Sequence, residues 1–323
     1  MISYRIGANE AGQRFDKYLR KLLREAPSSF IYKMLRKKNI VLNGRKSDGS
    51  QILADGDEVK LFLADDTLHK FMGQPSGEGE TLSGSYPYHP LEVLYEDEDW
   101  LMVNKPAGIL SQKAVPEDIS MNEWIIGYLL HTGCLMPEQL ATFKPSVCNR
   151  LDRNTSGLLA AGKTLAGSQS LSEAFRERTV QKHYRCLAAG RVTESMHLRG
   201  YLSKDEKTNR VTLTTEEVAN ARPIETELTP LSVYREATLL SVHLITGRTH
   251  QIRAHLASIG HPILGDGKYG DSRVNEEWKR RAGVRRQLLH AYSLTLADGR
   301  SITAELPQDF CRALRELEQE THK

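Results

Sequence analysis

The sequence predicts an α+β protein of two domains, a small head of helices and a hairpin and a larger domain of alternating strands and helices. Three observations carry this prediction. The chain has 323 residues, and a domain generally holds about 100 to 200 residues. Basic residues gather near the N-terminus, and the apolar pattern changes to alternating strands and helices after residue 90. We therefore place the domains at residues 1–64 and 91–323, with a linker at residues 65–90.

Two helices and a hairpin are expected in the head. A set of apolar residues recurs at helical spacing and predicts an amphipathic first helix. These residues are Phe15, Tyr18, Leu19, Leu22 and Leu23. Ser28 or Ser29 is the expected N-cap of a second helix over residues 30–38. Residues 40–44 and 56–63 are expected to form strands, the first ending in a tight turn at Gly44.

Charge separates the head from the segment that follows it. Residues 12–46 contain eleven basic and two acidic residues, a net charge of +9, whereas residues 65–99 contain one basic and nine acidic residues, a net charge of −8. A basic head on an acidic connector indicates a polyanion-binding module; the alternative is a solvated helix face. The candidate polyanion contacts in the head are Arg14, Lys17, Lys33, Arg36, Lys37, Lys38 and Asn43.

The rest of the chain is predicted from its periodicity. Residues 73–85 are rich in Gly and Ser and poor in large apolar residues, which indicates a flexible linker. Strands are then expected at 91–95, 100–104, 158–162, 182–192 and 239–244, and helices at 165–178 and 249–260. In the last helix Thr249 is the expected N-cap and Gly260 the C-terminal residue. Its buried stripe should be Ile252, Leu256 and Ile259.

Membrane and metal-dependent classes are not expected. No apolar run approaches the roughly 18 residues of a membrane span, and the N-terminus lacks a secretory signal, so we expect a soluble, cytoplasmic protein. The four cysteines have no C-x-x-C spacing and are expected to be reduced, buried thiols. His250 and His255 are five residues apart, about 140° around a helix, so they cannot share one ion. We expect no bound metal.

One acid in a polar segment is the leading candidate for chemistry. Asp152 lies between Arg150 and Arg153, and their charges should keep it ionised, as a salt-bridge acceptor or as a nucleophile or base. The alternative is a surface ion pair. Residues 155–157 are expected to form a turn before a buried strand, a position where rigid scaffolds display catalytic groups. Arg253 should share a helix face with His250 and needs an acid partner, for which Asp152 is the candidate.

Four ordered motifs resemble the RluA-type pseudouridine synthases. They are Arg150–Leu159, Lys182–Tyr184, Gly247–Arg253, and Gly260–Asp266 with Tyr269–Gly270. Residues 12–64 also resemble the S4 RNA-binding domain. The resemblance implies a catalytic domain built on a mixed, mainly antiparallel sheet, and an enzyme that isomerises uridines in structured RNA. One departure is Asn149, where that family often has histidine.

The resemblance also implies the partners of the protein. Large-subunit ribosomal RNA in pre-ribosomal particles fits an S4-like head best, with transfer RNA as the runner-up. No cofactor is required, because the uracil is detached, turned and rejoined through C5. The chain is expected to act as a monomer.

The same resemblance assigns roles to residues. Asp152 would attack C1′ or take the 2′ proton, and both routes stay open. Tyr184 would stack on the uracil and help remove its C5 proton, Arg253 would pair with Asp152, and Arg150 would fill the space left by a flipped base. Supporting motif residues are Thr155, Ser156, Gly157, Lys182, Gly247, Thr249, His250 and Gln251.

Two alternative functions remain at this point, and further basic residues extend the candidate RNA-binding surface or form a solvated face. The chain could be a non-catalytic RNA-binding or ribosome-assembly protein, although such a protein has no chemical reason to keep Asp152, Tyr184 and Arg253 together. A sugar hydrolase is disfavoured because glycosidases generally need two carboxylates. Further basic residues at 279–281 and 285–286 extend the RNA track or form a solvated helix face.

Overall fold

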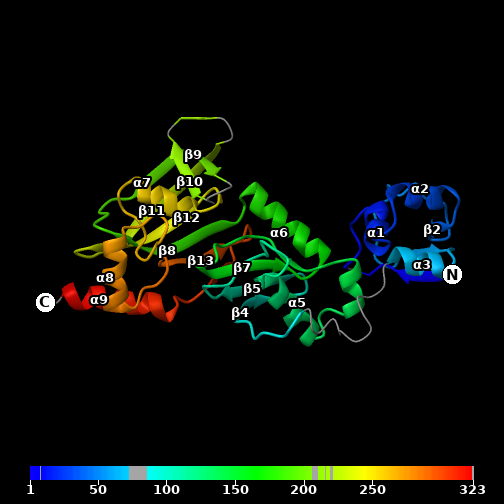
Figure 1. Ribbon diagram of the computed structural model, residues 1–323, viewed down its shortest axis with the longest axis horizontal. Helices are drawn as coiled ribbons and strands as arrows, with labels where there is room; N and C mark the ends of the chain where they lie inside the picture. The colour runs from blue at the N-terminus through cyan, green and yellow to red at the C-terminus, as the bar shows by residue number, and fades with distance from the viewer. Residues whose placement is uncertain (8, 73–85, 206–209, 215, 219–220, 322–323) are drawn as a thin grey trace.

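The computed structural model describes residues 1–7, 9–72, 86–205, 210–214, 216–218 and 221–321 (Figure 1). Apolar side chains form two large buried cores, one within residues 6–68 and the other within residues 101–317. The α+β class is confirmed, and the division into two domains stays a prediction. The Gly- and Ser-rich segment 73–85, predicted as a linker, lies outside the described residues.

The head is a three-stranded antiparallel sheet, in the order β1-β3-β2, packed against helices. Its elements are β1 (Ile2–Arg5), α1 (Phe15–Leu22), α2 (Ser28–Arg36), β2 (Ile40–Leu42), β3 (Glu58–Leu61) and α3 (Asp65–Met72). All five apolar residues predicted for the first helix are buried. The sequence did not predict β1, because Ile2 and Tyr4 alone give too short an alternation.

Two boundaries in the head were wrong. Helix α2 begins at Ser28 with extended Pro27 as its N-cap, and no serine side chain caps it. Proline suits that position because its fixed φ continues into a helix. The first part of the expected linker is the helix α3, whose Leu68 is buried in the head core with Phe71 against it. Because this segment begins with acidic residues, the sequence was assigned to the acidic connector and the helix was not predicted. Acidic residues in a first turn in fact stabilise a helix.

The large domain is built on one mixed sheet, which confirms a mainly antiparallel architecture. Among the described residues the strand order is β10-β9-β11-β12-β8-β13-β7-β5-β4, with β14 beside β13 and β6 beside β7. Only β7 and β13 pair in parallel. The strands are β4 (Val93–Glu96), β5 (Trp100–Lys105), β6 (Ser146–Val147), β7 (Ser156–Gly162), β8 (Gln181–Ala189), β9 (Met196–Asp205), β10 (Arg210–Thr214), β11 (Arg222–Val233), β12 (Ala237–Leu244), β13 (Leu289–Thr295) and β14 (Ser301–Thr303).

Helices cover this sheet and close its ends (Figure 1). They are α5 (Met121–His131), the 3₁₀ helix η1 (Pro137–Ala141), α6 (Leu165–Glu177), α7 (Gln251–Ser258), α8 (Ser272–Ala282) and α9 (Gln308–Thr321). Helix α6 matches its prediction closely and packs on β7. No helix in the described part of the chain is long and apolar enough to cross a membrane.

The central strand β7 brings the segment that carries Asp152 to the middle of the sheet. All seven of its residues are buried, as its apolar run predicted. Gly157 has φ 111°, and a Cβ there would stand 2.2 Å from the carbonyl oxygen of Ala291, so only glycine permits this strand pair. The turn expected at residues 155–157 was wrong, because Ser156 and Gly157 already belong to β7. The turn lies at residues 152–155, where Thr155 N–H donates to the Asp152 carbonyl.

Helix α7 also differs from its prediction. Its N-cap is His250, in the left-handed conformation with φ 55°, and not Thr249. Its residues from Gln251 to Leu256 are all buried, so the helix has no solvated face at its start. Gly260 takes the expected left-handed conformation after the helix.

The expectation of four buried thiols was wrong. Of the cysteines, only Cys186 is buried, and Cys134 is exposed. The basic residues after α7 stay an RNA track or a solvated helix face, since Arg280 and Arg285 are exposed while acids pair with the other three. Lys279 pairs with Glu276, Arg281 pairs with Glu236, and Arg286 pairs with Asp309.

Candidate active site

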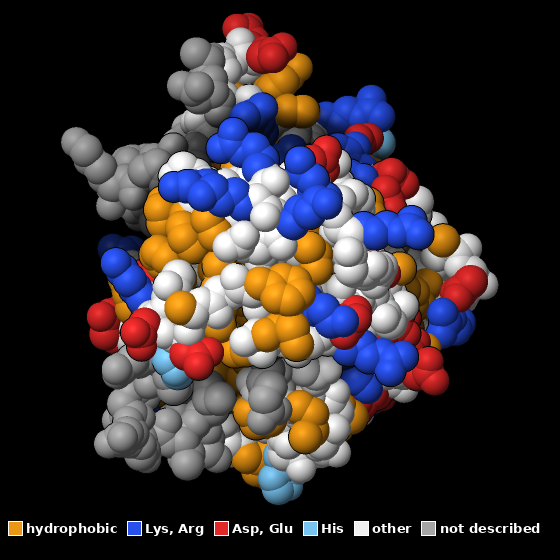
Figure 2. All heavy atoms as spheres, turned by 90° about the vertical axis from the view of Figure 1, so that its right-hand side faces the viewer, with side chains coloured by type: hydrophobic (Ala, Val, Ile, Leu, Met, Phe, Trp, Pro, Cys, Tyr) orange, Lys and Arg blue, Asp and Glu red, His pale blue; other side chains and the backbone are white. Residues whose placement is uncertain are grey.

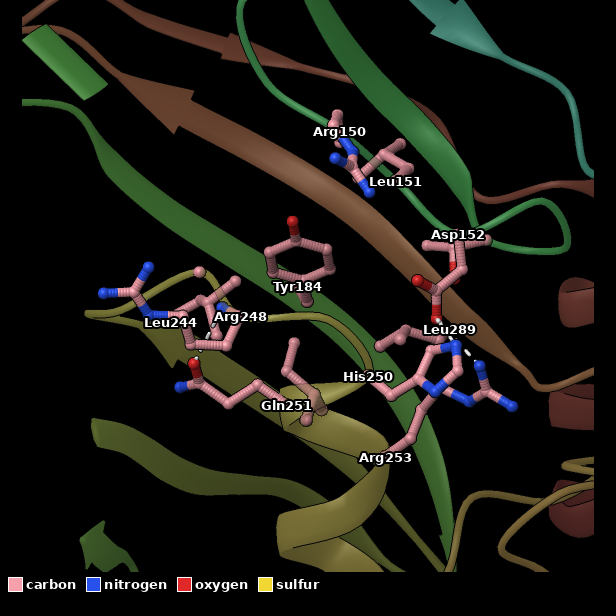
Figure 3. A pocket seen from close by; sticks show the side chains of 13 residues that line it. Arg150, Leu151, Asp152, Tyr184, Leu244, Arg248, His250, Gln251, Arg253 and Leu289 are labelled. Carbon is pink, nitrogen blue, oxygen red and sulfur yellow. Dashed lines mark hydrogen bonds and ion pairs between the residues drawn. The ribbon is translucent and has the colours of Figure 1, made fainter. Parts of the chain in front are cut away.

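A pocket of about 410 Å³ lies between the segment before β7, strands β8 and β12, and the start of α7 (Figure 3). It is lined by Arg150, Asp152, Tyr184, Leu244, His250, Gln251, Arg253, Leu289 and neighbouring residues. Three motifs that are far apart in the sequence therefore meet at one cavity. Asp152, His250 and Arg253 lie together on one side, and Arg248 and Gln251 lie on the opposite side.

The carboxylate of Asp152 stands at the edge of this pocket. Its side chain is 24% exposed, and its Oδ2 accepts a hydrogen bond from Arg253 Nη1 at 2.8 Å. His250 Nε2 lies 3.9 Å from the same oxygen. The acid is thus fixed on one side and open to the pocket on the other. This is the partner predicted for Arg253.

The two arginines that flank Asp152 in sequence do not hold it. Arg153 turns toward Asp118, at 4.0 Å, and Arg150 is exposed along the pocket wall. In the described residues the ion-pair partners of Asp152 come from the start of α7. The sequence expectation that its neighbours keep it ionised was therefore wrong in its source of charge.

Arg253 has a second acid that the sequence did not identify. Its Nε and Nη2 donate to Asp266 Oδ2 and Oδ1 at 2.7 and 2.9 Å, a bidentate pair with side chains 8% and 0% exposed. Burial opposes both charges, but hydrogen bonds between the partners outweigh it, raising the pKa of Arg253 and lowering that of Asp266. Asp266 belongs to the Gly260–Asp266 motif, but its separation from Arg253 in the sequence gave no reason to pair the two residues.

Tyr184 forms one wall of the pocket from strand β8. Its side chain is buried, and its ring faces the space between Arg150 and the start of α7 (Figure 3). Burial, and then the charge of Asp152, raises the pKa of its phenol, so the group stays neutral. A neutral ring beside Leu244 and Leu289 is suited to stacking on a flat heteroaromatic group.

Hydrogen bonds made by residues at the start of α7 hold this helix in position. His250 Nδ1 lies 3.0 Å from the hydroxyl of Tyr269, which accepts from Val211 N–H. The Gln251 amide accepts from Arg248 N–H at 3.0 Å and donates to the carbonyl of Glu225 at 3.0 Å. These contacts tie the helix to strand β11 and set the direction of Arg253.

The loop that carries Asp152 is held from behind by buried groups. The Ser111 hydroxyl donates to the Leu151 carbonyl at 2.9 Å and accepts from its N–H at 3.0 Å. Lys105 Nζ donates to the Arg153 carbonyl at 3.1 Å, and Gly108 N–H donates to it at 2.8 Å. Burial, and then the charge of Arg286, lowers the pKa of Lys105 to about 7. The sequence gave Lys105 and Ser111 no role.

The polar residues of the predicted motif have structural partners here. The Thr155 hydroxyl accepts from the Gln287 side chain at 3.3 Å, and Ser156 Oγ lies 2.9 Å from His290 Nδ1. The Asn149 side chain donates to the Leu158 carbonyl at 3.3 Å and accepts from Ala160 N–H at 2.8 Å. Its amide therefore joins the segment before Asp152 to β7.

A wider basic cleft leads to the pocket. Its cations are Arg150, Arg176, Arg178, Lys182 and Arg248, and Asp152 is the one acid that lines it among the described residues. Burial, and then the charge of Arg178, lowers the pKa of Lys182. Gly247 lies beside Lys182 Nζ, 3.8 Å from where a Cβ would stand, and Thr249 also lines the cleft. Such a cleft attracts polyanions.

The predicted head contacts are all at the surface. Each of the eleven basic residues within 12–46 is exposed. Figure 2 views the molecule from the side of the head and shows many Lys and Arg side chains spread over this face. The amide of Asn43 donates to Asp57 at 2.8 Å and accepts from Glu58 N–H at 2.8 Å, which holds the hairpin turn.

The histidines of this region do not converge. His255 Nδ1 lies 2.9 Å from Thr226 Oγ1, away from the site of His250. No group of three or more His, Cys, Asp or Glu side chains in the described part of the chain could hold a metal ion.

Comparison with known proteins identifies relatives across most of the chain. The model of a family described as RNA pseudouridylate synthase matches residues 99–258. Two curated proteins named ribosomal large subunit pseudouridine synthase C are similar: one from Vibrio cholerae is 32% identical, covering 90% of this chain and 86% of the relative. The other, from Escherichia coli, is 33% identical, covering 94% of this chain and 92% of the relative.

A solved structure supports the same fold. The human RNA pseudouridylate synthase domain containing 4 superposes with a TM-score of 0.58 at 21% identity, covering 70% of this chain and 92% of that chain. At that identity the similarity concerns the fold alone.

Proposed function

Because this chain belongs to the RNA pseudouridylate synthase family, we propose that it converts particular uridines of large-subunit ribosomal RNA to pseudouridine. The observation that carries the proposal is the carboxylate of Asp152, held by Arg253 at 2.8 Å and open to a pocket walled by Tyr184. An oriented, ionised acid beside an aromatic wall supplies both of the groups that the reaction needs at the sugar and at the base.

The reaction conserves every atom of the substrate. The N1–C1′ bond breaks and its electron pair leaves with the uracil. In one route an oxygen of Asp152 bonds to C1′; in the other Asp152 takes the 2′ proton and a glycal forms. The uracil then turns and C5 bonds to C1′; in the first route the bond from Asp152 to C1′ breaks, and in the second Asp152 returns the proton to C2′. The C5 proton then leaves and N1 gains a proton. We keep both routes, since each uses the same carboxylate.

Tyr184 and Arg253 are proposed to support the acid. Arg253 directs the carboxylate of Asp152 through the bond from Nη1, while its bidentate pair with Asp266 fixes the guanidinium. Tyr184 would stack on the uracil while it turns. Its raised pKa means that it holds its own proton at rest, so removal of the C5 proton would require that proton to leave first.

The uridine must leave its base stack before Asp152 can reach C1′. Base-modifying enzymes extrude the target at a cost of a few kcal/mol. We propose that exposed Arg150, at the rim of the pocket, stacks in the space that the base vacates. The cleft cations, among them Arg178 and Lys182, would hold the phosphates on either side.

Ribosomal RNA is the proposed target because the similar curated proteins are named for the large ribosomal subunit. Transfer RNA is the alternative substrate. We propose that the chain acts on pre-ribosomal particles in the cytoplasm as a monomer, since one chain supplies Asp152, Tyr184 and Arg253.

Mapping of pseudouridines tests this target. Total RNA from cells with and without the gene should differ at one or a few positions of large-subunit ribosomal RNA, and the purified protein should restore them on RNA from the deletion strain. A difference confined to transfer RNA would replace the proposed substrate. An unchanged map, with no product from the purified protein, would remove the proposed function.

The head is proposed to be an S4-type RNA-binding domain. Deleting residues 1–72 should lower RNA affinity about 10- to 100-fold and flatten its dependence on salt, because fewer counterions are released. The cut follows residue 72 because α3 belongs to the head core. Filter binding between 50 and 300 mM salt measures the slope of RNA affinity against salt concentration. The triple variant Lys33→Gln, Arg36→Gln and Lys37→Gln is a control in which the head stays folded, and it should flatten this slope partly. A deletion that leaves the slope unchanged contradicts the role.

A further inference from the structure

Arg286 sits immediately before strand β13 and reaches two other elements. Its Nε and Nη2 donate to Asp309 Oδ2 and Oδ1 at 2.7 and 2.8 Å. Its Nη1 donates to the carbonyl of Asn154 at 3.1 Å and to that of Gln287 at 3.2 Å. The side chain is only 11% exposed and its pair with Asp309 is partly buried, whereas its bond to the Asn154 carbonyl lies at the surface.

The Asn154 carbonyl lies at the least supported corner of the catalytic loop, residues 152–155. Lys105 and Gly108 hold the Arg153 carbonyl, and a single backbone bond from Thr155 N–H to the Asp152 carbonyl closes the turn. The side chains of Arg153 and Asn154 are exposed and pack on no core. The bond from Arg286 therefore attaches a part of the loop that the sheet does not hold.

We propose that Arg286 is a positioning residue, which fixes the catalytic loop to the first turn of helix α9 and so sets the position of Asp152. A guanidinium suits this task because its planar fork satisfies the Asp309 carboxylate while the remaining nitrogen reaches a carbonyl. The geometry distinguishes this role from the RNA contact expected from the sequence, since the charge of Arg286 is neutralised inside the protein.

The proposal predicts a loss in the chemical step and not in binding. A displacement of about 1 Å at a reacting group can cost about 100-fold in rate. Arg286→Gln should therefore lower kcat about 10- to 100-fold while KM for RNA changes less than about threefold. Asp309→Asn keeps the bond to Asn154 but loosens the guanidinium, and should lower kcat by less. Arg286→Lys keeps a positive charge beside Asp309 but lacks the planar fork of a guanidinium, so its kcat should stay below that of the parent.

Arg281 offers a matched control. It is also a half-buried arginine at this end of the domain, and its pairs with Glu236 and with Glu316 of α9 lie outside the loop. Arg281→Gln should lower stability and leave kcat near that of the parent. Hydrogen exchange of the peptide at residues 150–157 adds a measure that needs no activity: it should quicken in Arg286→Gln and not in Arg281→Gln.

The outcomes separate this proposal from the proposed function, on which the kinetic measurement rests. If the parent protein forms no pseudouridine, the function fails and the exchange experiment still tests the loop. If the parent is active, a kcat for Arg286→Gln within roughly twofold of the parent, or an equal loss in Arg281→Gln, overturns the positioning role. If Arg286→Gln does not fold, unchanged exchange at residues 150–157 in both Asp309→Asn and Arg286→Lys overturns it.

Discussion

Replacing Asp152 with Asn is expected to lower pseudouridine formation by about 10⁴-fold, the scale seen when an essential catalytic side chain is removed. The amide is nearly the same size, but it can neither attack C1′ nor accept the 2′ proton. Both routes therefore fail together. Single-turnover assays on large-subunit ribosomal RNA, with the product read by mass spectrometry, measure the effect.

The fold and the affinity for RNA should survive this change. Asp152 is partly exposed, and Arg253 keeps its bidentate pair with Asp266, so the free energy of unfolding should fall by no more than about 1 kcal/mol. Asp118→Asn is the matched control, because that acid faces Arg153 of the same loop from outside the pocket. It should keep full activity. Residual turnover in Asp152→Asn close to that of the control would show that another group initiates the reaction.

Replacing Asp266 with Asn is expected to give the largest loss of stability, about 3 to 5 kcal/mol in the free energy of unfolding. The change leaves the buried charge of Arg253 with only the partly exposed Asp152 as its acid. An amide at this position can still accept from Lys268 N–H and Tyr269 N–H, so the local turn is retained and the loss reports the missing charge.

Tryptophan fluorescence during urea unfolding measures this effect in the large domain. Trp100, Trp124 and Trp278 all lie there, and the head contains no tryptophan. Asp152→Asn serves as the comparison, since it removes the other acid from the same arginine. Equal unfolding free energies for the two variants would contradict the assignment of Asp266 as the main support of Arg253. Activity of Asp266→Asn should also fall, because Arg253 loses its fixed direction.

Local patterns predicted much of the secondary structure. The period of apolar residues placed α1 and α6 to within a residue or two, because an amphipathic helix must present one apolar face whatever its partner. The apolar run of β7 predicted a strand that is buried on both faces. The same logic missed α3, since a short helix in an acidic segment carries too few apolar positions to stand out.

For the candidate site too, the sequence predicted some features and missed others. The chemical character of Asp152, Tyr184 and Arg253 is visible in their motifs, and the structure brings all three to one pocket. Of their partners, the sequence predicted the pair between Asp152 and Arg253 but not the second acid, Asp266. Asp152 has two arginines beside it in sequence, yet it pairs with Arg253, which is 101 residues away. The backbone directs the flanking arginines outward, and only the packing of α7 against the sheet supplies the cation.

The sequence by itself predicted which side chains carry the proposed chemistry, because reactivity belongs to the residue type and to its immediate neighbours. It also predicted two domains, through the change in charge and in periodicity along the chain. Only the tertiary structure decided the partners of these cations: Arg253 forms an ion pair with Asp266, Arg286 forms one with Asp309, and Lys105 donates to carbonyls behind the loop. The physical reason is that burial makes an unpaired charge costly, and burial is set by segments that the sheet brings together from distant parts of the chain.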